Sequence, residues 1–125
     1  MHLSHYDDIR PFVTKDGSEI RDWAGVGGLS TSIPAVNQSL AEATIAPGSS
    51  TQAHHHVRTE ELYLVVEGTG RLRVGDDERD LAQGDCALIP PGAEHEIVNT
   101  GSGPLRILCA CAPAYSDEDT VLTEG

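Results

Sequence analysis

The chain has 125 residues, the size of a single domain with one core. Its formal net charge is −12, so its surface repels phosphate backbones and anionic lipid, and we expect neither nucleic acid nor a membrane as a partner. Thirteen glycines and seven prolines, beside a hydrophobic fraction of 38%, indicate many turns between short elements, as in an all-β fold.

Residues 1–36 are predicted to form an N-terminal arm of the same domain, with short strands at Phe12–Val13 and Glu19–Trp23. Residues 37–113 show short apolar or alternating runs separated by glycine and proline turns, without a helical period from residue 39 to residue 112. This pattern is typical of a β-sandwich or barrel. The strands predicted there are Ser39–Ala46, Ala53–His56, Leu62–Val66, Arg71–Val74, Glu78–Leu81, Cys86–Ile89, Glu94–Val98 and Leu105–Ala110. Residues 114–125 are predicted to be a solvated acidic C-terminal tail.

The strand LYLVV, residues 62–66, is apolar on both faces. A strand with one solvated face normally alternates between apolar and polar side chains, so the outer face is predicted to be covered. The cover is the N-terminal arm, a second sheet layer or another subunit. Because dimerisation also protects exposed sheet edges, we expect a homodimer.

The chain has three cysteines, Cys86, Cys109 and Cys111. Their odd number and their spacing do not match a disulfide framework. We expect reduced thiols in a cytoplasmic protein. The first residues, MHLSHYDDIRP, contain no apolar stretch of the kind found in signal peptides, and no apolar run approaches membrane-spanning length.

The sequence AHHHVRTEE, residues 53–61, suggests a metal site. His54 and His56 project from the same face of a strand, roughly 6.5–7 Å apart. Glu61 would return from the adjoining strand, and His95 would be brought in by tertiary folding. Three imidazoles and one carboxylate suit a divalent transition-metal ion (Fe, Mn, Co, Ni, Cu or Zn) and disfavour Ca²⁺ and Mg²⁺. Three consecutive histidines are equally compatible with a solvated loop, so the local pair does not decide.

Two separate segments resemble the two motifs of the cupin superfamily. In the first, Gly48 is followed after five residues by His54, after one by His56, after four by Glu61 and after six by Gly68. In the second, Gly84 is followed after five residues by Pro90, after one by Gly92, after two by His95 and after three by Asn99. The resemblance covers about residues 38–112. It implies a double-stranded β-helix, or jelly-roll barrel, with one divalent metal ion on His54, His56, Glu61 and His95, and with structural roles for the remaining motif residues.

The outer segments resemble a narrower group of small single-domain bacterial cupins, often labelled phosphomannose-isomerase-like on fold similarity. The resemblance lies in three segments: KDGSEI at 15–20, NQSLAEATI at 37–45 and CACAPAYSDEDT at 109–120. Fold similarity does not fix a reaction, so the label gives no activity.

Strand alternation sorts the neighbours of this site. It turns His55 away from the ion, while Tyr63 shares the parity of Glu61 and is expected to face the interior. Tyr63 is therefore a candidate catalytic residue, and its alternative role is a core aromatic side chain. Gln52, Cys109 and Cys111 are candidate pocket residues, although buried cysteines usually act as small hydrophobic side chains.

The function expected from these observations is a small-molecule enzyme that uses the metal ion for isomerase, epimerase or dioxygenase chemistry. The alternative is a non-catalytic, metal-dependent binding or sensing module for a sugar or small metabolite. A third hypothesis is a structural cupin in which the metal is incidental.

Overall fold

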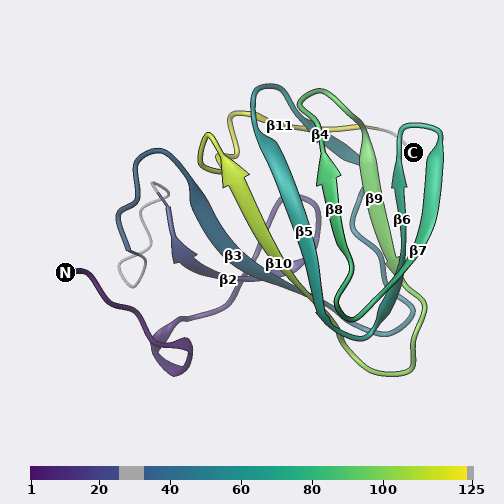
Figure 1. Cartoon of the computed structure of the whole chain (residues 1–125), viewed down its shortest axis with the longest axis horizontal. Coiled ribbons are helices and arrows are strands. Elements are labelled where there is room, and N and C mark those ends of the chain that lie inside the picture. Colours follow the sequence, from purple (N-terminus) through teal and green to yellow (C-terminus); the bar gives the residue numbers. More distant parts are fainter. Residues whose placement is uncertain (26–32, 124–125) are drawn as a thin grey trace.

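The computed structural model describes residues 1–25 and 33–123, and two antiparallel sheets face each other in it (Figure 1). The larger sheet has the strand order β1-β2-β3-β10-β5-β8, and the smaller one has the order β11-β4-β9-β6-β7. The first sheet contains β1 (Phe12–Val13), β2 (Glu19–Ala24), β3 (Ser39–Ile45), β10 (Leu105–Ala112), β5 (Glu60–Glu67) and β8 (Cys86–Ile89). The second contains β11 (Thr120–Leu122), β4 (His54–His56), β9 (His95–Asn99), β6 (Thr69–Val74) and β7 (Asp77–Ala82). A short 3₁₀ turn, η1 (Tyr6–Asp8), precedes β1.

The strand pairing is that of a jelly roll. Strands far apart in sequence pair within each sheet, as β3 does with β10 and β6 with β9. The predicted all-β, double-stranded β-helix fold is confirmed, and every predicted strand is present with ends that differ by no more than two residues. The described residues form no helix with the length and apolar character of a membrane span.

The hydrophobic core lies between the two sheets. Its members are Ala43, Ile45, Tyr63, Val65, Leu72, Ile89, Ile97, Leu105, Ile107 and Cys109. They come from alternate positions of the facing strands, because side chains on a strand point to opposite faces in turn. Gly68 allows the chain to turn from β5 to β6 here: its φ is +88°, and a Cβ would lie 2.5 Å from the carbonyl oxygen of Pro104.

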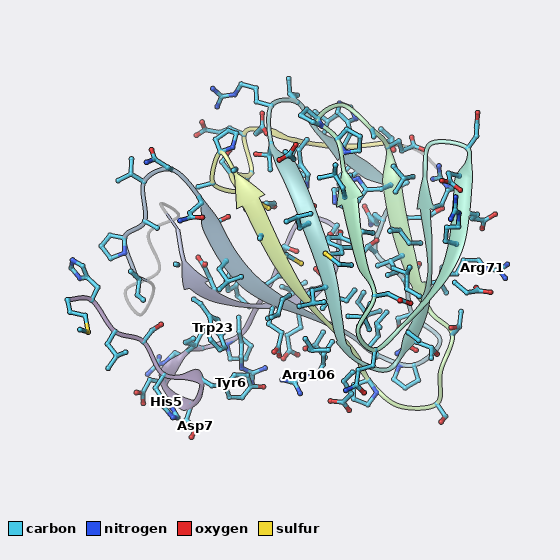
Figure 2. All side chains as sticks on the ribbon, in the orientation of Figure 1. His5, Tyr6, Asp7, Trp23, Arg71 and Arg106 are labelled. Carbon is cyan, nitrogen blue, oxygen red and sulfur yellow. The ribbon has the colours of Figure 1, made fainter. Side chains whose placement is uncertain are left out.

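The N-terminal arm is part of the larger sheet. β2 pairs with β3 in register from Glu19 opposite Thr44, so the arm extends the edge of the jelly roll within the same chain. Upstream of it, the ring of Tyr6 packs at 6.4 Å against Trp23 and lies near the guanidinium group of Arg106 (Figure 2). The arm therefore covers one end of the outer face of this sheet.

The C-terminal segment differs from the predicted solvated tail. Thr120–Leu122 forms β11, which pairs with β4, and Asp119 and Thr120 are buried. The Asp119 carboxylate accepts hydrogen bonds from the backbone N–H groups of Arg58 and Thr59 in the β4–β5 turn. The acidic composition suggested solvation, but this carboxylate is used to satisfy buried backbone donors.

Candidate metal centre

Three histidines converge between the sheets. His54 and His56 lie on β4, and His95 lies opposite His54 on the neighbouring strand β9. Their candidate ligand atoms all lie within 4.8 Å of one another, and the three residues are 2%, 3% and 0% exposed. Alternation along β4 leaves His55 outside this group, which brings together side chains from both sequence motifs.

Each of the three rings is oriented by a hydrogen bond at Nδ1. His54 Nδ1 donates to the carbonyl oxygen of Gln52 at 2.7 Å, and His95 Nδ1 donates to that of Ala93 at 3.0 Å. His56 Nδ1 lies 3.0 Å from the hydroxyl oxygen of Thr120, whose own proton is donated to the carbonyl oxygen of Ser116. The hydroxyl is thus an acceptor for His56. All three rings carry a proton on Nδ1 and turn Nε2 toward the centre, the nitrogen through which such a ring can bind a metal ion.

Glu61 lies beside two of the rings. Its Oε1 is 3.2 Å from His56 Nε2 and 3.5 Å from His95 Nε2, and the residue is 5% exposed. Burial by itself raises the pKa of this carboxyl, but the rings of His56 and His95 outweigh that effect and hold the pKa at about 2. Glu61 is therefore an anion at neutral pH, whereas the adjacent Glu60 is exposed.

The donor set fits a transition-metal ion. His54 is neutral at physiological pH, because burial and the neighbouring His95 lower its pKa. His95 Nε2 is buried without a hydrogen-bond donor or acceptor within bonding geometry. Three imidazoles and an anionic carboxylate form a nitrogen-rich donor set, and such sets favour transition metals over Ca²⁺ or Mg²⁺.

Cys111 acts on this centre through Glu61. Its Sγ donates to Glu61 Oε2 at 3.3 Å, and burial followed by the Glu61 charge raises the pKa of the thiol, so that it stays protonated. Cys109 is also buried, with a raised pKa, and its thiol is directed to the carbonyl oxygen of Ile107 at 3.9 Å. Cys86 is exposed, and all three cysteines are free thiols, as the sequence predicted.

A cavity of about 470 Å³ opens beside the histidines. Tyr63, which shares the parity of Glu61, lines it together with the candidate pocket residues Cys109 and Cys111. Burial raises the pKa of Tyr63, so its hydroxyl stays protonated. Gln52, expected at the edge of this pocket, has an exposed side chain outside the lining, and Thr51 lines the cavity instead. Gln52 contributes through its backbone carbonyl, because the chain bends before β4 begins at His54.

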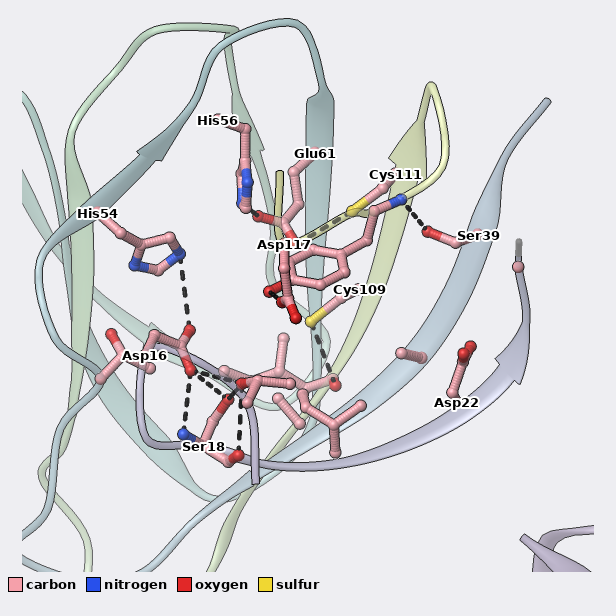
Figure 3. A pocket seen from close by; sticks show the side chains of 18 of the residues that line it. Asp16, Ser18, Asp22, Ser39, His54, His56, Glu61, Cys109, Cys111 and Asp117 are labelled. Atoms are coloured by element: carbon pink, nitrogen blue, oxygen red, sulfur yellow. Dashed lines mark hydrogen bonds and ion pairs between the residues drawn. The ribbon is translucent and has the colours of Figure 1, made fainter. Parts of the chain in front are cut away.

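Sequence reasoning missed Asp16, which the β1–β2 hairpin brings to the cavity (Figure 3). Its Oδ2 lies 3.6 Å from His54 Nε2. The only local signal was Thr14-Lys15-Asp16-Gly17-Ser18, which predicts a turn but gives no sign of where that turn docks.

The charges around the cavity have one sign. Among the described residues that line it are five carboxylates and no lysine or arginine. The five acidic residues are Asp16, Asp22, Glu61, Asp117 and Glu118. Apolar side chains of Ala43, Ile45, Ile97 and Ile107 complete the lining. The cavity lining therefore combines negative charge with apolar side chains.

Known proteins resemble this chain in sequence and in structure. The cupin domain family model matches residues 41–111. An uncharacterised protein of Methanocaldococcus jannaschii, MJ1618, is 43% identical over 122 residues, which span 97% of this chain and 94% of that protein. A mannose-1-phosphate guanylyltransferase of Klebsiella pneumoniae is 35% identical over 81 residues, and the match spans 63% of this chain but 17% of that enzyme.

Among solved structures, Pac13 of Streptomyces, described as a nucleoside dehydratase, superposes with a TM-score of 0.79 at 15% identity. The superposition covers 99% of this chain and 92% of Pac13, and at this identity it shows the fold alone. The cupin family model spans both histidine segments, and the relative MJ1618 matches over nearly its full length. The chain therefore belongs to the cupin family.

Proposed function

We propose that this cupin is a metal-dependent enzyme that acts on a small molecule, with a divalent transition-metal ion held by His54, His56, Glu61 and His95. The observation that carries the proposal is the convergence of three Nδ1-tethered histidines, two of which, His54 and His56, line a cavity of about 470 Å³. A purely structural metal site has no need of an adjoining cavity of ligand size. We place the chemistry in the isomerase, epimerase or dioxygenase class.

The bound ion would supply Lewis acidity to a substrate oxygen. The protein's own groups then divide into donors and acceptors. Tyr63 remains protonated and lines the cavity, so it is positioned to donate a hydrogen bond to substrate. Cys111 donates to Glu61 and fixes the direction of that carboxylate. This division supports Tyr63 as the residue that orients the substrate and Cys111 as one that orients a metal ligand.

The charge of the lining favours a neutral or cationic substrate. A phosphorylated substrate would face five carboxylates without a lysine or arginine among the described lining residues. The guanylyltransferase relatives act on mannose 1-phosphate by name, but this chain matches only 17% of such an enzyme. A neutral polyhydroxylated molecule, such as a sugar or a nucleoside, fits this lining of apolar, hydroxyl and carboxylate groups better than its phosphate ester does.

The test begins with metal content. The protein is purified without chelator, analysed for bound metals, stripped, and titrated with Mn²⁺, Co²⁺, Ni²⁺ and Zn²⁺ by calorimetry. His95→Ala should weaken metal binding at least about 100-fold, since even residues that only orient metal ligands usually contribute 10–100-fold. His55→Ala is the matched control and should bind like the wild type, because the group of converging histidines leaves it out.

Catalysis is tested on the loaded protein with panels of neutral sugars, nucleosides and their phosphate esters, followed by mass spectrometry and oxygen consumption. Turnover of a neutral compound that is lost in His95→Ala supports the proposal. Metal-dependent binding of a compound that is recovered unchanged would make the protein a binding module. Unaltered metal content in His95→Ala would exclude the centre itself.

A further inference from the structure

The β1–β2 hairpin presents one oxygen of Asp16 to the metal centre. Asp16 Oδ1 accepts hydrogen bonds from the Thr14 hydroxyl at 2.8 Å, the Ser18 backbone N–H at 3.0 Å and the Ser18 hydroxyl at 2.7 Å. These three donors saturate Oδ1 and fix the plane of the carboxylate. Oδ2 is left to face His54 Nε2 at 3.6 Å.

The hairpin is fixed to the site on both sides. The backbone N–H of Gln52 donates to the Asp16 carbonyl at 2.8 Å, and the Gln52 carbonyl in turn accepts from His54 Nδ1 at 2.7 Å. On the other side, Lys15 Nζ donates to the carbonyl oxygens of Asp117 and Thr120 at 3.1 Å and 3.0 Å. Asp16 is therefore held beside His54 by contacts separate from the approach of Oδ2 to Nε2. A turn whose only task was to connect two strands would not need this attachment.

Both atoms of the Asp16–His54 pair are acceptors. The Nδ1–H of His54 is donated to Gln52, so Nε2 of the neutral ring presents a lone pair to the Asp16 carboxylate. Glu61 Oε1 lies 3.2 Å from His56 Nε2 and 3.5 Å from His95 Nε2, and Figure 3 shows Glu61 beside His56 and Asp16 beside His54. The buried His95 Nε2 has no hydrogen-bond partner. Two carboxylates thus flank the group of three histidines whose candidate ligand atoms lie within 4.8 Å of one another, Asp16 beside His54 and Glu61 beside His56 and His95.

We infer that Asp16 is a fifth protein ligand of the metal ion, a role that rests on the proposed metal site. Two donor atoms each about 2.1 Å from an ion, at right angles, are about 3 Å apart. The 3.6 Å between Asp16 Oδ2 and His54 Nε2 is within a small side-chain adjustment of that spacing. Glu61 provides the carboxylate next to His56 and His95, and Asp16 provides the one next to His54.

A fifth ligand changes what the centre accepts. Four protein ligands leave two positions open on an octahedral ion, whereas five leave one. One open position serves an isomerase or lyase that polarises a single substrate oxygen. It does not serve a dioxygenase that takes substrate and dioxygen on the ion together. Two carboxylates also balance the charge of a divalent ion, which further disfavours an anionic substrate.

The experiment compares Asp16→Asn with Asp22→Asn. In the Asp16→Asn variant the carboxamide oxygen keeps the acceptor for Thr14 and Ser18, but the NH₂ group replaces the oxygen that faces the centre. Asp22 lines the same cavity far from His54, so its variant removes an equal charge elsewhere (Figure 3). Stripped proteins are loaded with Mn²⁺ alone. Affinity is measured by calorimetry, and exchangeable water on the ion is counted by electron paramagnetic resonance in ¹⁷O-labelled water.

We expect one exchangeable water in the wild type and in Asp22→Asn, and two in Asp16→Asn. Mn²⁺ affinity should fall at least about 10-fold in Asp16→Asn and change by no more than about 3-fold in Asp22→Asn. The wild-type water count does not depend on whether a variant folds. Two waters in the wild type, or wild-type affinity and water count in Asp16→Asn, would remove Asp16 from the ligand set. Absence of Mn²⁺ binding to the wild type, or unchanged binding in His95→Ala, would instead overturn the metal site as a whole.

Discussion

Each face of the strand pair β5–β10 departs in part from the usual distribution of polar and apolar side chains. On the inward face, Glu61 lies opposite Cys111, and both are buried beside the histidines. On the outward face, Leu62 and Leu64 are 42% and 37% exposed. Polar side chains are normally found outside and apolar ones inside, so each departure points to an interaction that the isolated chain does not complete.

The inward face itself changes character along the strands. At the histidine end it carries a carboxylate and thiols, whereas at the other end of β10 it carries Leu105 and Ile107, which are 0% and 1% exposed. The apolar end supplies stability through burial. The polar end buries less apolar surface, because its inward positions hold charged and hydrogen-bonded groups. Stability and metal binding should therefore respond to different substitutions on the same strand.

The largest effect on stability is expected at the apolar end. Leu105→Ala should lower the free energy of unfolding by about 3 kcal/mol, because it removes a fully buried side chain packed between the sheets. Denaturant unfolding measures the loss, and metal titration of the folded protein should give wild-type stoichiometry and affinity. A loss below about 1 kcal/mol would show that this end of the interior is not the stabilising one.

A smaller effect, confined to metal binding, is expected at the polar end. Cys111→Val keeps a side chain of similar size but removes the thiol that donates to Glu61 Oε2. Metal affinity should fall about 10-fold, the lower end of the range for groups that orient a metal ligand, because a thiol is a weak donor. Cys109→Val is the matched control, since its thiol contacts a backbone carbonyl instead of a candidate ligand. Equal metal affinities in the two variants would contradict the role assigned to Cys111.

The sequence predicted the strands and the histidine group because both depend on local regularities. Alternation along β4 places His54 and His56 on one face, and the glycine and proline positions mark where strands end. His95 could be joined to them only through the second motif. The motif spacing that ends at Gly68 selects Glu61 and not the adjacent Glu60, and in the structure Glu61 is buried whereas Glu60 is exposed.

What the sequence did not predict depends on docking. Asp16 lies in a polar turn, and nothing in its neighbourhood indicates that Gln52 anchors that turn beside His54. Asp119 and Thr120 belong to an acidic stretch that looks solvated, yet one caps the β4–β5 turn and the other orients His56. Composition reports the average environment of a segment, whereas these roles depend on single long-range hydrogen bonds.

The outward face of the larger sheet carries an exposed apolar row. Ala110 pairs with Leu40 and Leu62, and Leu62 pairs with Leu88, so an apolar row crosses four strands of the larger sheet. Among the described residues, the N-terminal arm packs Tyr6 near Arg106 at the far end of β10, and Leu62 and Leu88 keep 42% and 55% of their surface exposed. We propose that a second copy of the chain covers this row, because it is an uncharged surface on a molecule of net charge −12.

The smallest effect on the isolated fold, and the clearest on assembly, is expected from Leu62→Lys combined with Leu88→Lys. Light scattering should give twice the 13.3 kDa chain mass for the wild type and the chain mass for the variant, because an unpaired charge cannot be buried in an apolar interface. The added lysines also lower the net negative charge of each chain and so weaken the repulsion between two copies. Dissociation of the variant would therefore show that the apolar row itself holds the two copies together. Val57→Lys, at an exposed turn position outside the row, should leave the mass unchanged. Unfolding free energy measured on dissociated chains should change by no more than about 0.5 kcal/mol in each variant, as at ordinary surface positions. A wild-type mass of one chain at all concentrations would show that the apolar row needs no second copy.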